Sequence, residues 1–118
     1  MAVHFIGHAS EISPGQRKVI KIGRIEIGVF NIGGKFFALP NLCPHQFGPL
    51  CGGKLTGAIV ADAASDFGPR WEFDGEVVCC PWHGLEFNVT TGRSLAYRTL
   101  KLRQYPVTVE NDRLSLIV

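Results

Sequence analysis

The chain has 118 residues, which is the size of one domain and is enough to bury a core without disulfides. Its 46% hydrophobic and 19% charged residues describe an ordinary globular protein, and a formal net charge of +2 is too small to indicate binding to nucleic acid or to a membrane surface. The N-terminal residues 1–11 lack the basic, apolar and small-residue regions of a secretory signal, and no run reaches the roughly 18 apolar residues of a membrane helix. We therefore expect one cytoplasmic domain over residues 1–118, with neither nucleic acid nor a membrane as its partner.

Short β-branched runs that alternate with turn residues predict an all-β domain. The first predicted strand is Val19 to Ile22. In residues 24–30 the apolar residues recur with the two-residue period of a half-buried strand. A turn over Asn31 to Lys35, centred on two glycines, returns the chain into a strand at residues 36–39.

Residues 57–74 are the least regular part of the sequence. Ala61 to Ser65 could form one helical turn, and residues 70–73 could begin a hairpin into residues 76–79. The pair Asp74 and Gly75 is the expected turn of that hairpin.

Alternation and turn residues predict the remaining strands. A strand over Glu76 to Cys79 precedes Cys80, and another over Leu85 to Val89 ends at a turn over residues 90–92. The segment 107–118 reads as a closing hairpin with its turn at Asn111 and Asp112. The sequence contains no internal repeat.

Two short clusters carry the chemistry: Cys43-Pro44-His45 and Cys80-Pro81-Trp82-His83. Each supplies one thiolate and one imidazole, with the cysteine first. A familiar zinc finger instead takes two cysteines from one turn and two histidines from a helix. One Cys and one His from each loop suit a [2Fe–2S] cluster in which one iron has two thiolates and the other has two imidazoles.

Two other interpretations of these four residues remain open. Zinc accepts two cysteines and two histidines in any order, so a structural zinc site is possible. The residues could also be unliganded core cysteines with incidental histidines. The iron–sulfur interpretation alone also accounts for nearby residues that restrict or relax the backbone of the loops. These residues are Pro44, Gly48, Pro49, Pro81 and Gly84.

The segments CPHQFGPL and CPWHGLEFNVTTG resemble the cluster-binding signature of Rieske proteins, in the ferredoxin and oxygenase branch of that family. The resemblance implies a Rieske-type antiparallel β-sandwich or barrel, with a small cluster-binding subdomain of two ligand loops at about residues 41–92. It implies one [2Fe–2S] cluster per chain as the cofactor. The residues that bind this cluster, and that are the ligands of its iron, are Cys43, His45, Cys80 and His83. The two ligand pairs lie further apart than is usual in compact Rieske ferredoxins, so we expect an insertion at about residues 57–74, which long loops tolerate.

Replacing two thiolates by imidazoles makes the cluster less negative and raises its potential above that of an all-cysteine cluster. High-potential Rieske proteins carry a serine and a tyrosine hydroxyl two and four residues after the second histidine ligand; here these positions are Leu85 and Phe87. They also carry a disulfide cysteine where this chain has Trp82. The resemblance therefore implies a potential at the low end of the range of about −150 to +300 mV.

The other two cysteines, Cys51 and Cys79, are expected to be free thiols, because a reducing compartment disfavours a disulfide between them. A disulfide or an alternative ligand role is the competing interpretation. Cys79 should point away from Cys80 and pack in the core, because neighbouring residues of a strand face opposite sides.

Three apolar residues near the ligands, Phe47, Leu50 and Trp82, are expected to shield the cluster or to form the rim that a redox partner touches. A simple core role for Phe47 is the alternative. His4 and His8 are given no role.

These features predict an electron carrier and not an enzyme, because four protein ligands leave no open metal position. The leading hypothesis is a ferredoxin that shuttles electrons from a flavin reductase to a terminal oxygenase. An alternative is a small subunit or Rieske-like component of a larger oxidoreductase, in a nitrite reductase or ring-hydroxylating oxygenase system. A zinc-stabilised binding module is the third. A complete ring-hydroxylating oxygenase is excluded, because only His4 and His8 remain to build a second iron site.

Overall fold

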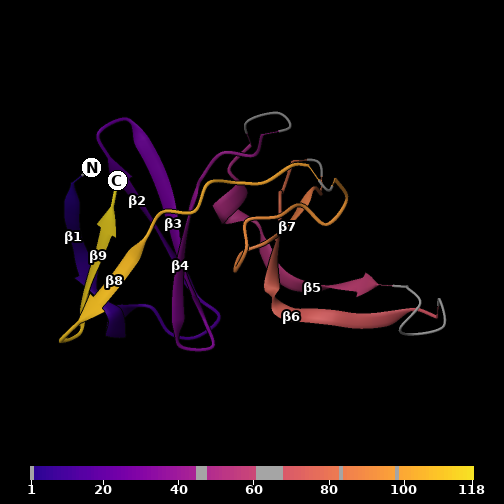
Figure 1. Cartoon of the computed structure of the whole chain (residues 1–118), viewed down its shortest axis with the longest axis horizontal. Coiled ribbons are helices and arrows are strands. Elements are labelled where there is room, and N and C mark those ends of the chain that lie inside the picture. Colours follow the sequence, from indigo (N-terminus) through magenta and orange to yellow (C-terminus); the bar gives the residue numbers. More distant parts are fainter. Residues whose placement is uncertain (1, 45–47, 61–67, 83, 98) are drawn as a thin grey trace.

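The computed structural model describes residues 2–44, 48–60, 68–82, 84–97 and 99–118. In these residues the regular structure consists of β-strands and two single-turn 3₁₀ helices, η1 (Ala9–Glu11) and η2 (Leu50–Gly52). The strands form three antiparallel sheets of three strands each, within an envelope of 46 × 30 × 22 Å (Figure 1). The predicted all-β class is confirmed.

The first sheet has the order β1-β9-β8 and joins the two ends of the chain. Its strands are β1 (Val3–His8), β9 (Arg113–Ile117) and β8 (Val107–Glu110). The predicted closing hairpin is confirmed, with positive φ of 52° and 64° at Asn111 and Asp112. The N-terminal strand was not predicted, and it is held by pairing with β9, a partner more than 100 residues away in the sequence.

The second sheet has the order β2-β3-β4, with β2 (Arg17–Ile22), β3 (Ile25–Ile32) and β4 (Lys35–Pro40). The turn between β3 and β4 is narrower than predicted, because Asn31 and Ile32 still pair with β4. Only Gly33 and Gly34 form its centre, at φ 61° and 93°, where glycine has no steric penalty.

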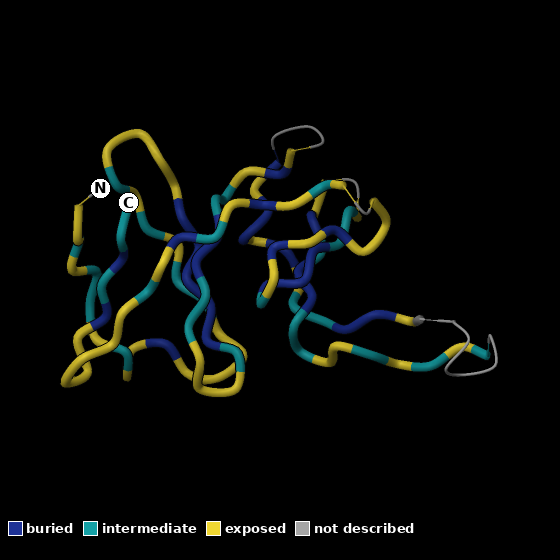
Figure 2. Tube along the Cα trace, in the orientation of Figure 1, coloured by how far each residue is buried: buried dark blue, intermediate teal, exposed yellow. Residues whose placement is uncertain are grey.

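Strand β3 is buried on both faces from Ile27 to Asn31, which corrects the half-buried strand expected from the alternation (Figure 2). Ile27 and Val29 pack into one apolar core, and Phe30 packs into another. The reason is tertiary: a sheet with a core on each side buries every residue of its central strand. The two-residue period is therefore divided between two cores, with neither face in water.

The third sheet has the order β5-β6-β7 and makes the other end of the molecule, with β5 (Lys54–Val60), β6 (Arg70–Cys79) and β7 (Glu86–Asn88). The described parts of the predicted insertion, residues 57–60 and 68–74, form the outer half of the hairpin β5–β6, which extends away from the rest of the chain (Figure 1). The helical turn predicted at Ala61 to Ser65 lies outside the described residues.

Asp74 and Gly75 do not form the predicted hairpin turn, because β6 runs through them from Arg70 to Cys79. Thr56 pairs with Val77 and Ala58 pairs with Glu72, so residues 73–76 bulge out opposite a single residue of β5. Positive φ at Phe73 and Gly75 (57° and 75°) accommodates the bulge. An Asp-Gly pair is compatible with a tight turn and also with a bulge. Here it forms a bulge, because β5 pairs with the residues of β6 on both sides of it.

No helix among the described residues is long and apolar enough to cross a membrane.

Candidate metal centre

The first ligand loop leaves β4 and closes on its own backbone. The Cys43 amide donates to the Gly48 carbonyl at 2.9 Å, and the Leu50 amide donates to the same carbonyl at 2.8 Å. The Asn41 side chain accepts the Cys51 amide at 2.8 Å. These bonds fix both ends of the loop, and Cys43 is 1% exposed at its base. His45, a predicted ligand, and Phe47, a predicted shielding residue, lie outside the described residues.

The second ligand loop joins β6 to β7 and is closed in a similar way. The Cys80 amide donates to the Leu85 carbonyl at 2.9 Å, and the Gly84 amide donates to the Cys80 carbonyl at 2.9 Å. Gly84 has φ 72°, a conformation that other residues rarely adopt, so the sequence expectation of a special backbone at this glycine is confirmed. Cys80 is 1% exposed. His83 lies outside the described residues.

The fold brings the two predicted cysteine ligands into one core although they are far apart in the sequence. Cys43 and Cys80 belong to the same buried cluster, together with Leu50 and Phe87. The loops also touch, because a Cβ added to Gly48 would lie 3.2 Å from the Cys80 sulfur.

Leu50 and Trp82 were both predicted to shield the site or to form its rim, and the structure places one of them inside and the other at the surface. Leu50 is fully buried in the core that holds the cysteines, whereas Trp82 is 57% exposed at the surface.

The two remaining cysteines have different surroundings. No disulfide joins Cys51 to Cys79, as expected. Cys51 is fully buried beneath Gly28, and this burial raises the pKa of its thiol to about 12. Cys79 does not pack in the core as predicted; it is half-buried, and it is Cys80 that lies in the core. Burial, and next the Glu86 carboxylate, raise the pKa of the Cys79 thiol.

The expectation for Cys79 failed because strand alternation indicates opposite faces without saying which face is buried. The third sheet covers the core on the Cys80 side, where Val78 and Phe87 also lie.

The donor set fits an iron–sulfur cluster. Two thiols, from Cys43 and Cys80, belong to one apolar core, and thiolate is the ligand that such clusters require. The described residues contain no group of three or more metal-binding side chains. The histidines that would complete the shell occupy positions 45 and 83, which the described residues do not include.

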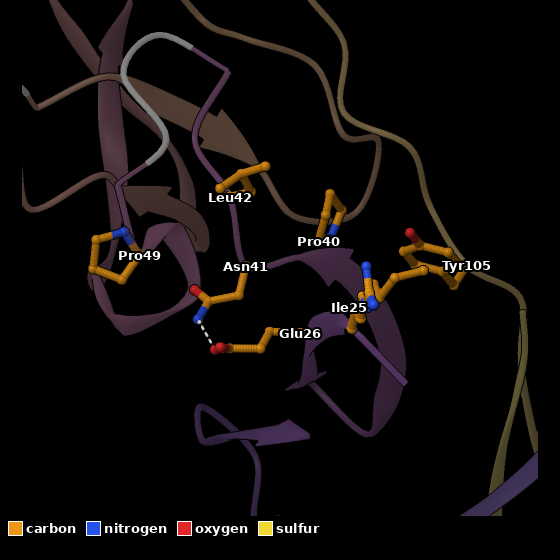
Figure 3. A pocket seen from close by; sticks show the side chains of 8 residues that line it. Ile25, Glu26, Pro40, Asn41, Leu42, Pro49 and Tyr105 are labelled. Atoms are coloured by element: carbon orange, nitrogen blue, oxygen red, sulfur yellow. Dashed lines mark hydrogen bonds between the residues drawn. The ribbon is translucent and has the colours of Figure 1, made fainter. Parts of the chain in front are cut away.

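An open groove of about 490 Å³ lies beside the first loop, and the sequence did not predict it (Figure 3). Leu42 and Pro49 line it on the loop side, and Tyr105 lines it on the side of the β-sheets. Two of the lining residues are bonded to each other, because the Asn41 side-chain amide donates to the Glu26 carboxylate at 3.2 Å. Its lining holds no nucleophile with an adjacent base, so the groove has the character of an outer surface.

The family model of the Rieske [2Fe-2S] domain matches residues 2–106. Ferredoxin CarAc of Metapseudomonas resinovorans is 33% identical over 85 residues, which are 71% of this chain and 63% of that protein. The ferredoxin component of the naphthalene 1,2-dioxygenase/salicylate 5-hydroxylase systems of a Ralstonia species is 28% identical over 107 residues, which are 90% of this chain and 86% of that protein.

The chain also matches part of a much longer protein. Apoptosis-inducing factor 3 of Mus musculus is 26% identical over 110 residues, which are 92% of this chain and only 15% of that protein. Among solved structures, a chain in the complex of reduced oxygenase and oxidized ferredoxin in carbazole 1,9a-dioxygenase superimposes with a TM-score of 0.74 at 26% identity, over 97% of this chain and 91% of that chain. The match of the family model over most of its length shows that the chain belongs to the Rieske [2Fe–2S] domain family.

Proposed function

We propose that this chain is a one-electron carrier of the ferredoxin type, which passes electrons from a flavin reductase to a terminal oxygenase. In this proposal Cys43 and Cys80 bind one iron of the cluster, and His45 and His83 bind the other. The observation that carries it is the meeting of two buried cysteines from separate loops in one core of a Rieske domain. A bound [2Fe–2S] cluster takes up and releases one electron.

The residues around the cysteines suit a carrier. The loop hydrogen bonds at Cys43 and Cys80 fix the backbone that carries both sulfurs, so less conformational freedom is lost when metal binds. Leu50 and Phe87 exclude water from the inner side of the sulfurs. On the outer side Trp82 lies at the surface, so a protein partner can approach the site closely.

The proposed ligand count supports a carrier role without catalysis. Four protein ligands complete the coordination of both irons and leave no position for a substrate. The similar ferredoxin of the Ralstonia species is named as one component of dioxygenase and hydroxylase systems.

The potential is expected to lie at the low end of the Rieske range. Leu85 and Phe87 stand where hydroxyl groups would stabilise a reduced cluster, and neither can donate a hydrogen bond. A midpoint potential well above zero would contradict this assignment.

A second candidate function is a Rieske component of a larger oxidoreductase. The match to 15% of apoptosis-inducing factor 3 favours it, because it shows a similar domain within a long chain. Gel filtration with candidate oxygenases and reductases separates the two, because a shuttle uses small transient interfaces. The cytoplasmic location stays a prediction, which cell fractionation would check.

The decisive experiment is metal analysis of the protein prepared without oxygen. We expect two iron and two sulfide per chain, bleaching by dithionite, and the low average g value in EPR of a cluster with two histidine ligands. Either zinc or no metal would overturn the proposal, and zinc would favour the zinc-stabilised module.

A further inference from the structure

The two ligand loops are each closed by their own hydrogen bonds, but a separate contact joins them to each other. The indole ring of Trp82, in the second loop, lies directly against the backbone of Gly48, in the first. We propose that Trp82 is a positioning residue that clamps the two loops together and slows loss of the cluster. This inference rests on the proposed function.

Gly48 is glycine because of this approach and not because of its backbone. It is not among the residues with positive φ, so other residues could adopt its conformation. A Cβ there would lie 2.8 Å from Cδ2 and 2.9 Å from Cγ of Trp82. These atoms are at the root of a rigid ring, so the side chain could not avoid the clash by moving its tip alone.

Gly48 offers Trp82 a fixed surface. Its carbonyl accepts the amides of Cys43 and Leu50, so the peptide on which the indole rests is tied to one ligand and to the core. Trp82 is only two residues beyond Cys80, whose sulfur would lie 3.2 Å from the same added Cβ. The ring thus connects the position of one cysteine ligand to the position of the other.

The contact matters because no covalent link duplicates it. All four cysteines are described and no disulfide joins the two loops. Trp82 is more than half exposed, so the protein core does not hold it in place. Packing of a large aromatic ring against a fixed backbone is then an outer contact between the loops, in addition to the core that their buried residues share.

The chain contains a matched control in Trp71, which lies on the hairpin β5–β6. Trp71 is 54% exposed, and its ring also packs on a glycine: a Cβ at Gly57 would lie 2.6 Å from Cζ2 and 2.7 Å from Cε2 of the ring, and 2.9 Å from the Glu72 carbonyl oxygen. This second pair has similar exposure, but it lies in the outer half of the hairpin, separated from the second ligand loop by the bulge at residues 73–76.

The experiment measures the rate at which the loaded protein loses its visible absorption in excess chelator. We expect Trp82→Ala and Gly48→Ala to accelerate the loss by about tenfold or more, as changes around metal ligands often do. Trp82→Phe, which keeps a ring, should restore an intermediate rate. In Trp71→Ala and Gly57→Ala the rate of cluster loss should stay within about twofold of the wild-type rate, because the tenfold effect is expected only for residues near the metal ligands.

A second measurement is the visible circular dichroism of the loaded proteins before chelator is added. We expect the Trp82 and Gly48 variants to change this spectrum and the Trp71 and Gly57 variants to leave it unchanged. If Trp82→Ala does not accumulate as folded protein, Trp82→Phe and Gly48→Ala carry the comparison with Trp71→Phe and Gly57→Ala.

Two outcomes would overturn the clamp: loss of the cluster at the wild-type rate in the Trp82 and Gly48 variants, or equal acceleration in the Trp71 and Gly57 variants. A wild-type protein that contains no iron–sulfur cluster would instead refute the proposed function. The two failures are therefore distinguishable.

Discussion

The two ends of the molecule are built around cores of different chemistry. The core under the sheets β1-β9-β8 and β2-β3-β4 is hydrophobic throughout, and its buried residues are Ile12, Ile27, Val29, Ala38, Tyr105, Leu114 and Leu116. The core under the ligand loops contains three cysteines, Cys43, Cys51 and Cys80, among its buried residues. The first core can form by apolar burial alone, whereas the second contains Cys43 and Cys80, whose thiols are the proposed metal ligands.

Strand β3 joins these two ends, because its side chains enter both cores. Ile27 and Val29 pack on one side and Phe30 on the other, while Gly28 makes room for Cys51. We therefore expect changes at the loops to affect the cluster with little effect on the sheets, and changes in the sheets to affect stability with little effect on the spectrum.

The largest effect is expected from Cys80→Ser, which removes a thiolate ligand that serine does not replace well. The visible absorption and the EPR signal should disappear, while the far-ultraviolet circular dichroism of the sheets is retained. Cys51→Ser is the control, because this cysteine is buried in the same core but is not a proposed ligand. Loss of the cluster in the control would mean that the ligands are misassigned.

In the apolar core, Leu116→Ala should lower the free energy of unfolding by about 2–5 kcal/mol, because Leu116 is fully buried and the truncation leaves a cavity. The spectrum of the folded fraction should be unchanged. Chemical denaturation followed by circular dichroism measures the first quantity, and absorption measures the second. A changed spectrum at full folding would show that the two ends are coupled more strongly than we infer.

A smaller effect is expected from the titration of Cys51. Burial raises the pKa of the folded thiol to about 12, above the usual value of 9.0, so the folded state holds its proton longer than the unfolded state. The stability that this provides is complete below pH 9 and is lost as the pH rises toward 12. Between pH 8 and pH 10 the wild type should lose about 1 kcal/mol more than Cys51→Ala.

This comparison is made by denaturation at both pH values. Equal losses in the wild type and Cys51→Ala would show that the thiol ionises in the folded protein near its ordinary pKa.

The smallest effect is expected at the far end of the first sheet. The Asp112 carboxylate accepts the backbone amide of Ser10 at 2.9 Å and its hydroxyl at 2.8 Å, which ties the closing hairpin to η1. Because the hydroxyl bond is exposed to water, Ser10→Ala, which removes that bond and leaves the turn at Asp112 unchanged, should cost only about 0.5 kcal/mol. Thermal unfolding measures this cost, with Asp74→Ala as a control on the hairpin β5–β6. A change in the cluster spectrum of Ser10→Ala would contradict the separation of the two ends.

Local pattern was sufficient where a turn and its two strands are adjacent in the sequence. The glycine turn after β3 and the Asn111-Asp112 turn before β9 were both located correctly. Prediction failed at β1 and at the bulge in β6, because both depend on distant pairing partners. It also failed for Cys79, where the periodicity was correct but the buried face was assigned to the wrong residue.

By itself the sequence determined the fold class, the family and the two ligand motifs, because strand period, turn chemistry and ligand spacing are local properties of the chain. The tertiary structure decided that β3 lies between two cores, that Cys43 and Cys80 share one of them, and that Trp82 rests on Gly48. These facts join residues that are distant along the chain. Which distant residues pack against each other depends on their shape and close packing, which the spacing of residues along the chain does not encode.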